Sequence, residues 1–168
     1  HADAAGEWPS TPMRALGVHA PAVVPGLWTA AASEAKAAGR LLAEVVEQQA
    51  LGRRSVSLVG FSLGARVVFH CLELLAERGA LGRVQDVALL GAAVTSKPSR
   101  WECVRPVVAG RLVNAYSASD HFLRAHHRLA HYASPPPAGA VAVKSLLVEN
   151  HDVGDALTEH RALAAAAP

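Results

Sequence analysis

The chain of 168 residues lacks most of the features that assign a protein to a specialised class. It has only two cysteines, Cys71 and Cys103, and no Cys-x-x-Cys pair, so we expect no disulfide framework but two reduced, buried thiols compatible with the cytosol. No run of Lys and Arg stands out and the formal net charge is only +2, so no nucleic-acid partner is expected. Gly, Arg or Pro interrupts every apolar stretch before the roughly 18 residues needed to cross a bilayer.

What is present is the composition of a folded domain. Hydrophobic residues make up 51% of the chain and charged residues 18%, which suits one core of ordinary size and excludes a disordered linker. The chain begins with His1, and its Pro-rich opening has neither the charged start nor the apolar centre of a signal peptide. We therefore expect an N-terminally truncated piece of a longer protein.

A single domain is predicted over residues 1–168. Its parts are an irregular Pro-rich lead-in over 1–28, a core over 29–163, and a frayed Ala-rich tail over 164–168.

Short apolar runs alternate with helical segments along the core. Helices are predicted over 29–49 and 63–78, the first with an apolar stripe made of Ala35, Ala38, Leu41, Leu42, Val45 and Val46. Four runs are predicted as strands: 55–60, 86–90, 111–116 and 141–148. Pro135 to Pro137 and Gly139 indicate a loop. This alternation predicts an α/β fold with a mostly parallel sheet and helices on both faces.

A Gly-x-Ser-x-Gly motif, Gly60 to Gly64, lies between the first predicted strand and the helix after it. This context indicates a nucleophile elbow, in which Ser62 projects above the sheet edge and the N–H of Leu63 stabilises an oxyanion. Both glycines are expected to be necessary, because a Cβ at either position would collide with the neighbouring strand or helix. The alternative is a tight structural turn without chemistry.

A serine nucleophile needs a base and a carboxylate that orients the base. Asp120 follows the third predicted strand, where the acid belongs in the order Ser, acid, His. The alternative is that it caps the helix that begins at His121. Arg66, two residues beyond the motif, is interpreted either as a surface helix residue or as a brace for the acid loop.

Nine histidines compete for the role of base, but only His151 and His160 follow the last predicted strand. Spacing alone favours His151, because it lies directly after that strand. The cluster His121, His126, His127 and His131 is interpreted as a solvated helix face, because no third ligand with zinc spacing follows the pair His127 and His131. No metal or cofactor is predicted.

Three separated blocks resemble the transmembrane and coiled-coil domain-containing protein 4 family, also called domain of unknown function 726. The blocks are Ser57 to Val67, Val108 to Ser117 with Asp120, and Val148 to Val153 with His160. The resemblance covers residues 50–163, and it implies an α/β-hydrolase fold with a Ser-Asp-His triad.

The resemblance also changes the choice of base. The family pattern carries a Gly-His pair after Asp-Val, which selects His160, while His151 stands at an apolar position of the pattern and Glu159 replaces the usual Gly. The strand and Gly-rich loop that would supply the second oxyanion donor fall before His1 or within the opening. In full-length members the domain is attached to predicted membrane-spanning segments, which implies a membrane-associated parent whose domain faces a reducing compartment such as the cytoplasm.

The leading hypothesis is a serine hydrolase of the esterase or lipase type, with Ser62 as nucleophile, His160 as base, Asp120 as orienting acid and Leu63 as oxyanion donor. An ester with an apolar or lipid-like acyl group is the expected substrate, because Phe61 and Leu63 flank the serine and Phe122 and Leu123 follow the acid. The alternative is a catalytically inactive α/β-hydrolase domain that serves as a protein-interaction or membrane-trafficking module.

Overall fold

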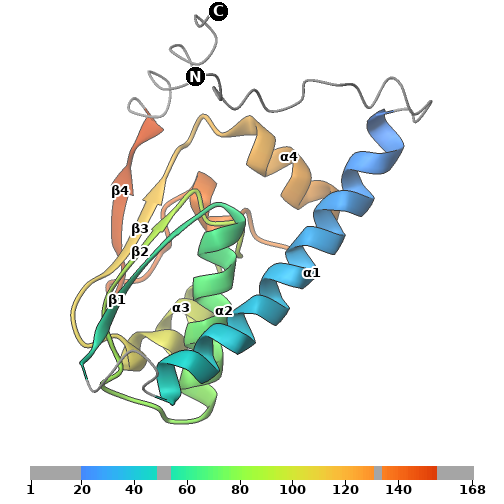
Figure 1. Ribbon diagram of the computed structural model, residues 1–168. Helices are drawn as coiled ribbons and strands as arrows, with labels where there is room; N and C mark the ends of the chain where they lie inside the picture. Colours follow the sequence, from blue (N-terminus) through green and yellow to red (C-terminus); the bar gives the residue numbers. More distant parts are fainter. Residues whose placement is uncertain (1–19, 49–53, 131–133, 155–168) are drawn as a thin grey trace, which may run out of the picture.

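The computed structural model describes residues 20–48, 54–130 and 134–154. Its strands are β1 Val56–Phe61, β2 Val84–Leu90, β3 Leu112–Tyr116 and β4 Glu149–Asp152. Its helices are α1 Ala20–Glu47, α2 Leu63–Glu77, α3 Pro98–Val104 and α4 His121–Ala130, with 3-10 turns η2 Arg105–Val107 and η3 Ala138–Ala140. Figure 1 shows the sheet on one side and the long helix α1 crossing outside α2 on the other.

The four strands form one parallel sheet in the order β1-β2-β3-β4. The predicted α/β class with a parallel sheet is confirmed. Each strand pairs with the next one in sequence, and right-handed connections between such strands leave the sheet on the same face. The helices of the described residues accordingly gather on one side in Figure 1, whereas the sequence predicts helices on both faces.

The other side of the sheet is open in the part of the chain that the structure describes. Val59 and Phe61 of β1 are 74% and 62% exposed, and the register aligns Phe61 with Leu90 of β2, Ala115 of β3 and His151 of β4. Partners in a parallel sheet point to the same face. Phe61, Leu90 and Ala115 therefore form an apolar row across this face, from the end of β1 to β3.

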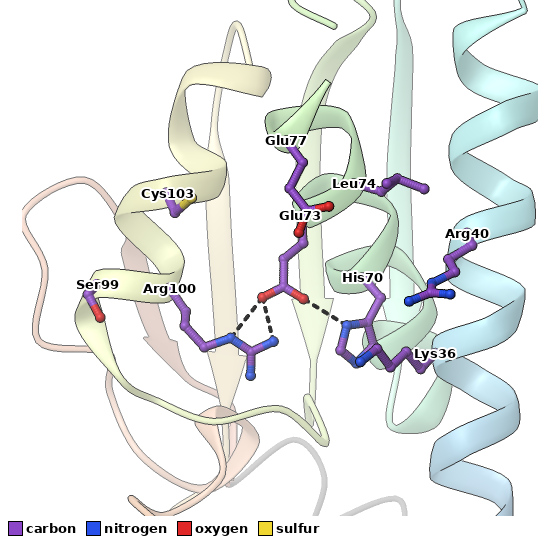
Figure 2. Close-up of a pocket in the computed structure, with 9 residues that line it drawn as sticks. All are labelled: Lys36, Arg40, His70, Glu73, Leu74, Glu77, Ser99, Arg100 and Cys103. Carbon is purple, nitrogen blue, oxygen red and sulfur yellow. Dashed lines mark hydrogen bonds and ion pairs between the residues drawn. The ribbon is translucent and has the colours of Figure 1, made fainter. Parts of the chain in front are cut away.

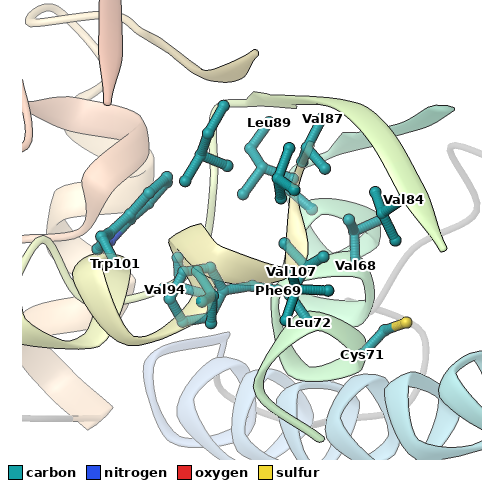
Figure 3. Packing of buried hydrophobic residues seen from close by; sticks show 14 of the residues in the cluster. Val68, Phe69, Cys71, Leu72, Val84, Val87, Leu89, Val94, Trp101 and Val107 are labelled. Carbon is teal, nitrogen blue, oxygen red and sulfur yellow. The ribbon is translucent and has the colours of Figure 1, made fainter. Parts of the chain in front are cut away.

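The core lies between the sheet and α2. The large buried side chains include Phe69, Leu72 and Leu75 from α2, Leu89 from β2 and Trp101 from α3 (Figure 3). The rings of Phe69 and Trp101 lie 5.0 Å apart between centroids. This cluster fixes α2, and with it the turn that precedes the helix, against the sheet.

The fourth strand lies later in the chain than predicted. Residues 141–148 form turns, and β4 spans only Glu149–Asp152. Asn150 explains the difference, because its side-chain Oδ1 accepts from the N–H of Val143 at 2.8 Å and its Nδ2 donates to the Val143 carbonyl at 2.9 Å. The amide holds the apolar run as a compact loop in which Leu146 and Leu147 are exposed.

Helix α1 starts at Ala20, so it takes in the end of the predicted irregular lead-in. Its buried side also differs from the predicted stripe, since Leu41 and Val45 are exposed. The residues buried against α2 are small or of moderate size: Ala32, Ala35, Gly39, Ala43 and Val46. At Gly39 a Cβ would come within 2.6 Å of the Val67 carbonyl oxygen, so the close approach of α1 and α2 selects the small residues.

The two cysteines have different environments. Cys71 is fully buried, and burial raises its pKa to about 12. Cys103 is exposed on α3, so the prediction that both thiols are buried was wrong for Cys103. Both are free, as predicted.

Candidate active site

Ser62 has an unusual backbone conformation at the turn between β1 and α2. Its φ and ψ are 52° and −116°, and it is the only residue other than glycine with positive φ in the described ranges. Non-glycine residues pay a steric cost there, and such strain concentrates at functional sites. This is the backbone form expected of a nucleophile elbow. The Oγ of Ser62 forms no hydrogen bond with any described residue, so it is available to a base or a substrate.

The N–H of Leu63 lies at the start of α2. The first N–H groups of a helix have no acceptor within it, and they carry the positive end of the helix dipole. Leu63 therefore suits the role of oxyanion donor that the sequence predicts.

The two glycines of the motif differ in their surroundings. A Cβ at residue 60 would lie 2.6 Å from Ala65 Cα and 2.8 Å from the Gly64 carbonyl oxygen, whereas a Cβ at residue 64 would meet nothing within 4 Å. Gly60 is therefore required where α2 packs back on β1. The prediction that both glycines avoid a collision was wrong for Gly64.

Hydrogen bonds hold the serine turn in place from two sides. The N–H of Ser62 donates to the Leu90 carbonyl at 2.9 Å, and the Ser62 carbonyl accepts from the N–H of Ala93 at 3.4 Å. The strained turn is thus tied to the end of β2 and to the loop that follows β2.

Gly139 links the loop after β2 to Ser117, which follows β3 in the turn that carries Asp120. The N–H of Gly139 donates to the Ala92 carbonyl at 3.0 Å, and the Gly139 carbonyl accepts from the N–H of Ser117 at 3.0 Å. A Cβ at residue 139 would lie 2.1 Å from the carbonyl carbon of Gly91. Sequence reasoning assigned Gly139 only to a loop, because nothing local reveals that it packs on the end of another strand.

Arg66 has neither of the predicted roles. Its Nε donates to the Ala32 carbonyl of α1 at 3.0 Å, and its Nη1 donates to the Ala93 carbonyl at 2.9 Å. Burial, with the nearby charge of Arg100, lowers the pKa of Arg66, and Glu73 opposes this. Arg66 braces α1 against the loop beside Ser62, not against the acid loop.

Asp120 follows β3 at the end of the sheet that also carries Ser62. Its Oδ1 accepts from the backbone N–H of Leu123 at 2.9 Å, so the carboxylate caps α4, as the alternative interpretation anticipated. The second carboxylate oxygen has no hydrogen bond to a described residue. Capping through one oxygen leaves the other able to orient an imidazole.

His151 lies within β4, not in a loop after the last strand. Strand alternation puts it on the open face of the sheet, opposite to Asn150, which contacts the buried Asn114. Its Nε2 is 4.0 Å from Glu149 Oε2. Ser62 follows β1, three strand spacings or about 14 Å away, so His151 is badly placed to act as its base.

His160 lies outside the described residues, but the chain leading to it is described as far as Gly154. A Cβ at Gly154 would lie 3.4 Å from Ser117 Oγ and 3.8 Å from Ser119 Oγ, and the N–H of Val153 donates to the Tyr116 carbonyl at 2.8 Å. The chain thus leaves β4 against the turn that carries Asp120.

The predicted histidine face is partly buried. His121 is exposed, but His127 is only 6% exposed, so the interpretation of a solvated face was wrong for His127. His131 and the side chain of His126 lie outside the described residues. No group of three metal-ligating side chains occurs in the part of the chain that the structure describes.

Comparison with known proteins assigns the family. The family model described as a protein of unknown function, DUF726, matches residues 5–167. The chain belongs to this family. The resemblance inferred from the three sequence blocks is therefore confirmed. No solved structure matches the chain.

Three relatives illustrate what this DUF726 chain is similar to. Transmembrane and coiled-coil domain-containing protein STS1 of Oryza sativa subsp. japonica is 41% identical over 165 residues, which cover 98% of this chain and 24% of that protein. An uncharacterized membrane protein of Schizosaccharomyces pombe is 41% identical over 134 residues, which cover 79% of this chain and 23% of that protein. Probable lipase MIL1 of Saccharomyces cerevisiae is 43% identical over 96 residues, which cover 57% of this chain and 9% of that protein. The DUF726 chain thus spans a quarter or less of these relatives.

Two of these relatives are named as membrane or transmembrane proteins. Among the described residues of the DUF726 chain, no helix combines the length and the hydrophobicity that crossing a bilayer requires.

Proposed function

We propose that the chain is the catalytic domain of a serine hydrolase that cleaves carboxylic esters. The strained backbone of Ser62, at a strand-to-helix turn with an unengaged Oγ, is the observation that carries the proposal. The similarity to a protein named probable lipase supports the same reaction class.

The proposed mechanism uses Ser62, His160 and Asp120. The Ser62 Oγ attacks the carbonyl carbon of the ester while its proton passes to His160, and Asp120 keeps the imidazole in the required tautomer. The N–H of Leu63 stabilises the tetrahedral oxyanion. Collapse of this intermediate releases the alcohol, which takes the proton from His160. Water then attacks the acyl-enzyme, the carboxylic acid leaves, and the Ser62 hydroxyl is restored.

The order of the strands is compatible with His160 as the base for Ser62. Ser62, Asp120 and the segment after β4 all lie at the carboxyl end of the sheet. The eight residue-to-residue steps from Asp152 to His160 span up to roughly 26 Å when extended, more than the three strand spacings of about 14 Å back to Ser62.

Apolar esters are the proposed substrates. Phe61, directly before the nucleophile, is 62% exposed on the open face. An acyl chain could cover this side chain and its apolar neighbours, and burial of apolar area is favourable at about 25 cal/mol per Å². We also propose that the intact protein associates with membranes through segments outside this chain, on the basis of the names of its relatives.

The test is covalent labelling with a fluorophosphonate, which reacts with an activated serine. The intact protein should be labelled at Ser62, and Ser62→Ala should abolish both the label and ester hydrolysis. Ser57→Ala is a matched control, because Ser57 is an exposed serine on the same strand, β1. No labelling under conditions that label a known serine esterase would overturn the proposal in favour of a non-catalytic interaction or trafficking module.

A further inference from the structure

A groove of about 540 Å³ lies in the helical layer, between α1 and α3 and above α2. The residues that line it are Lys36, Arg40, His70, Glu73, Leu74, Glu77, Ser99, Arg100 and Cys103. Figure 2 shows Lys36 and Arg40 on α1, Ser99 and Arg100 on α3, and His70 with Glu73 between them on α2. The groove is separate from the serine turn, because it uses the later turns of α2 and Ser62 precedes the first.

Positive charge in the groove exceeds negative charge. Lys36, Arg40 and Arg100 carry permanent charges, whereas Glu73 and Glu77 are the carboxylates. Lys36 and Arg40 lie one helical turn apart and form no ion pair or hydrogen bond with a described residue. These two cations are therefore available to a ligand.

Glu73 does not neutralise the two free cations. Its Oε1 accepts from Arg100 Nε at 2.7 Å and also from Arg100 Nη2, while its Oε2 lies 2.7 Å from His70 Nδ1. Burial alone raises the pKa of Glu73, but the hydrogen bonds and charges of His70 and Arg100 outweigh it and hold the pKa below its ordinary value. The charge of Glu73 is thus already engaged within the groove.

His70 supplies a second, independent observation. The residue is only 7% exposed, and its Nε2 is buried without a hydrogen-bond partner among the described residues. Buried polar atoms are rarely left unsatisfied, so an orphan nitrogen points to a missing partner. An imidazole that carries protons on both ring nitrogens can donate from Nδ1 to Glu73 and from Nε2 to an anion.

We propose that this groove binds a phosphate monoester, with Lys36 and Arg40 facing its charge and His70 donating from Nε2. The two unengaged cations attract a dianionic monoester, with one of their charges offset by the Glu77 carboxylate that also lines the groove. Lys and Arg side chains bind phosphate through strong charge-assisted hydrogen bonds. The phosphate belongs either to a small soluble ester or to the headgroup of a lipid.

The test is calorimetric titration of the intact protein in a Ser62→Ala background, so that no ester is hydrolysed during the measurement. The probes are glycerol 3-phosphate, dihexanoyl phosphatidic acid, which carries the same monoester on a short-chain lipid, and dihexanoyl phosphatidylcholine, which lacks it. We expect both monoesters to bind and the phosphatidylcholine not to bind. Tighter binding of the lipid would identify a headgroup, and equal binding would identify a soluble ester.

Two double variants separate a site from general charge. Lys36→Gln with Arg40→Gln should weaken monoester binding about tenfold or more. Arg54→Gln with Lys144→Gln removes the same charge from exposed positions outside the groove and should leave the dissociation constant within about twofold. Equal weakening by both variants, or no binding of either monoester, would overturn the proposal.

Cys103 provides a second readout that does not depend on a variant. It is exposed and lines the groove, so bound glycerol 3-phosphate should slow its alkylation by iodoacetamide, followed by mass spectrometry of its peptide. An alkylation rate that is unchanged at saturating ligand would contradict the location of the site. Neither measurement uses the Ser62 hydroxyl, so the outcome is independent of the proposed hydrolase activity.

Discussion

Gly60 and Ala65 approach so closely that a Cβ on residue 60 would lie 2.6 Å from the Ala65 Cα. The first turn of α2 therefore packs directly on the end of β1, and the backbone of Ser62 is bent to allow this. Gly64, the second glycine of the motif, has open space where its Cβ would be. The two glycines of the motif thus have different physical roles.

The first prediction compares Gly60→Ala with Gly64→Ala. Gly60→Ala should destabilise the protein by about 3 kcal/mol or more, because the contact is with backbone that cannot move aside. Gly64→Ala should be neutral or stabilising by up to about 1 kcal/mol, because alanine favours the helix in which residue 64 lies. Chemical denaturation measures both. Equal destabilisation by the two variants would contradict the asymmetry.

The sequence alone predicted those parts of the site that depend on residues close to one another along the chain. The apolar strand, the motif and the following helix are consecutive, so Ser62, Leu63 and the strained turn could be placed without tertiary information. The position of Asp120 at the same end of the sheet followed from the alternation of strands and helices. The N-cap contact of Asp120 could be predicted as the alternative because Asp120 directly precedes the helix that begins at His121.

The parts that failed depend on contacts between distant residues. The run 141–148 has strand-like composition, but the side chain of Asn150 holds it as a loop. The buried side of α1 is set by how closely α2 approaches at Gly39, which hydrophobic spacing does not encode. The groove also went unnoticed, although two basic residues four apart, Lys36 and Arg40, were a visible signal on α1.

The second prediction separates the two possible roles of Asp120. Asn also caps helices well, so Asp120→Asn should keep the melting temperature while slowing fluorophosphonate labelling at Ser62 by about 10⁴-fold, the loss typical of an amide at the acid position of such a triad. Asp120→Ala should slow labelling as much and also destabilise the protein by about 1 kcal/mol. Labelling by Asp120→Asn within about twofold of wild type would mean that the carboxylate only caps α4.

The third prediction concerns the base. His160→Gln should lower the rate of ester hydrolysis by about 10⁴-fold or more, because removal of the base leaves the Ser62 hydroxyl unactivated. His151→Gln is the matched control and should change the rate less than about twofold, since His151 lies on the open face beside Glu149. Steady-state kinetics on a short-chain ester measures both variants. The reverse pattern would assign the base to His151.

The fourth prediction uses the lowered pKa of Glu73. A carboxyl group whose pKa is lower in the folded than in the unfolded state stabilises the fold above the unfolded pKa, about 4.3. That stabilisation is lost as the pH falls through the folded pKa. Glu73→Gln should therefore lower the stability by about 1–3 kcal/mol near pH 7, and the difference from wild type should shrink as the pH falls below about 4.3.

Thermal unfolding followed by circular dichroism at a series of pH values measures this convergence. Glu102→Gln is the control, because Glu102 is an exposed carboxylate on α3 with no ion pair to a described residue; its unfolding curve should run close to that of wild type at every pH. If the loss of stability in Glu73→Gln, relative to wild type, stays constant down to low pH, the carboxylate acts by its shape and hydrogen bonding instead of its charge. Convergence would establish that the ion pair between Glu73 and Arg100 joins α2 to α3 only while Glu73 is ionised.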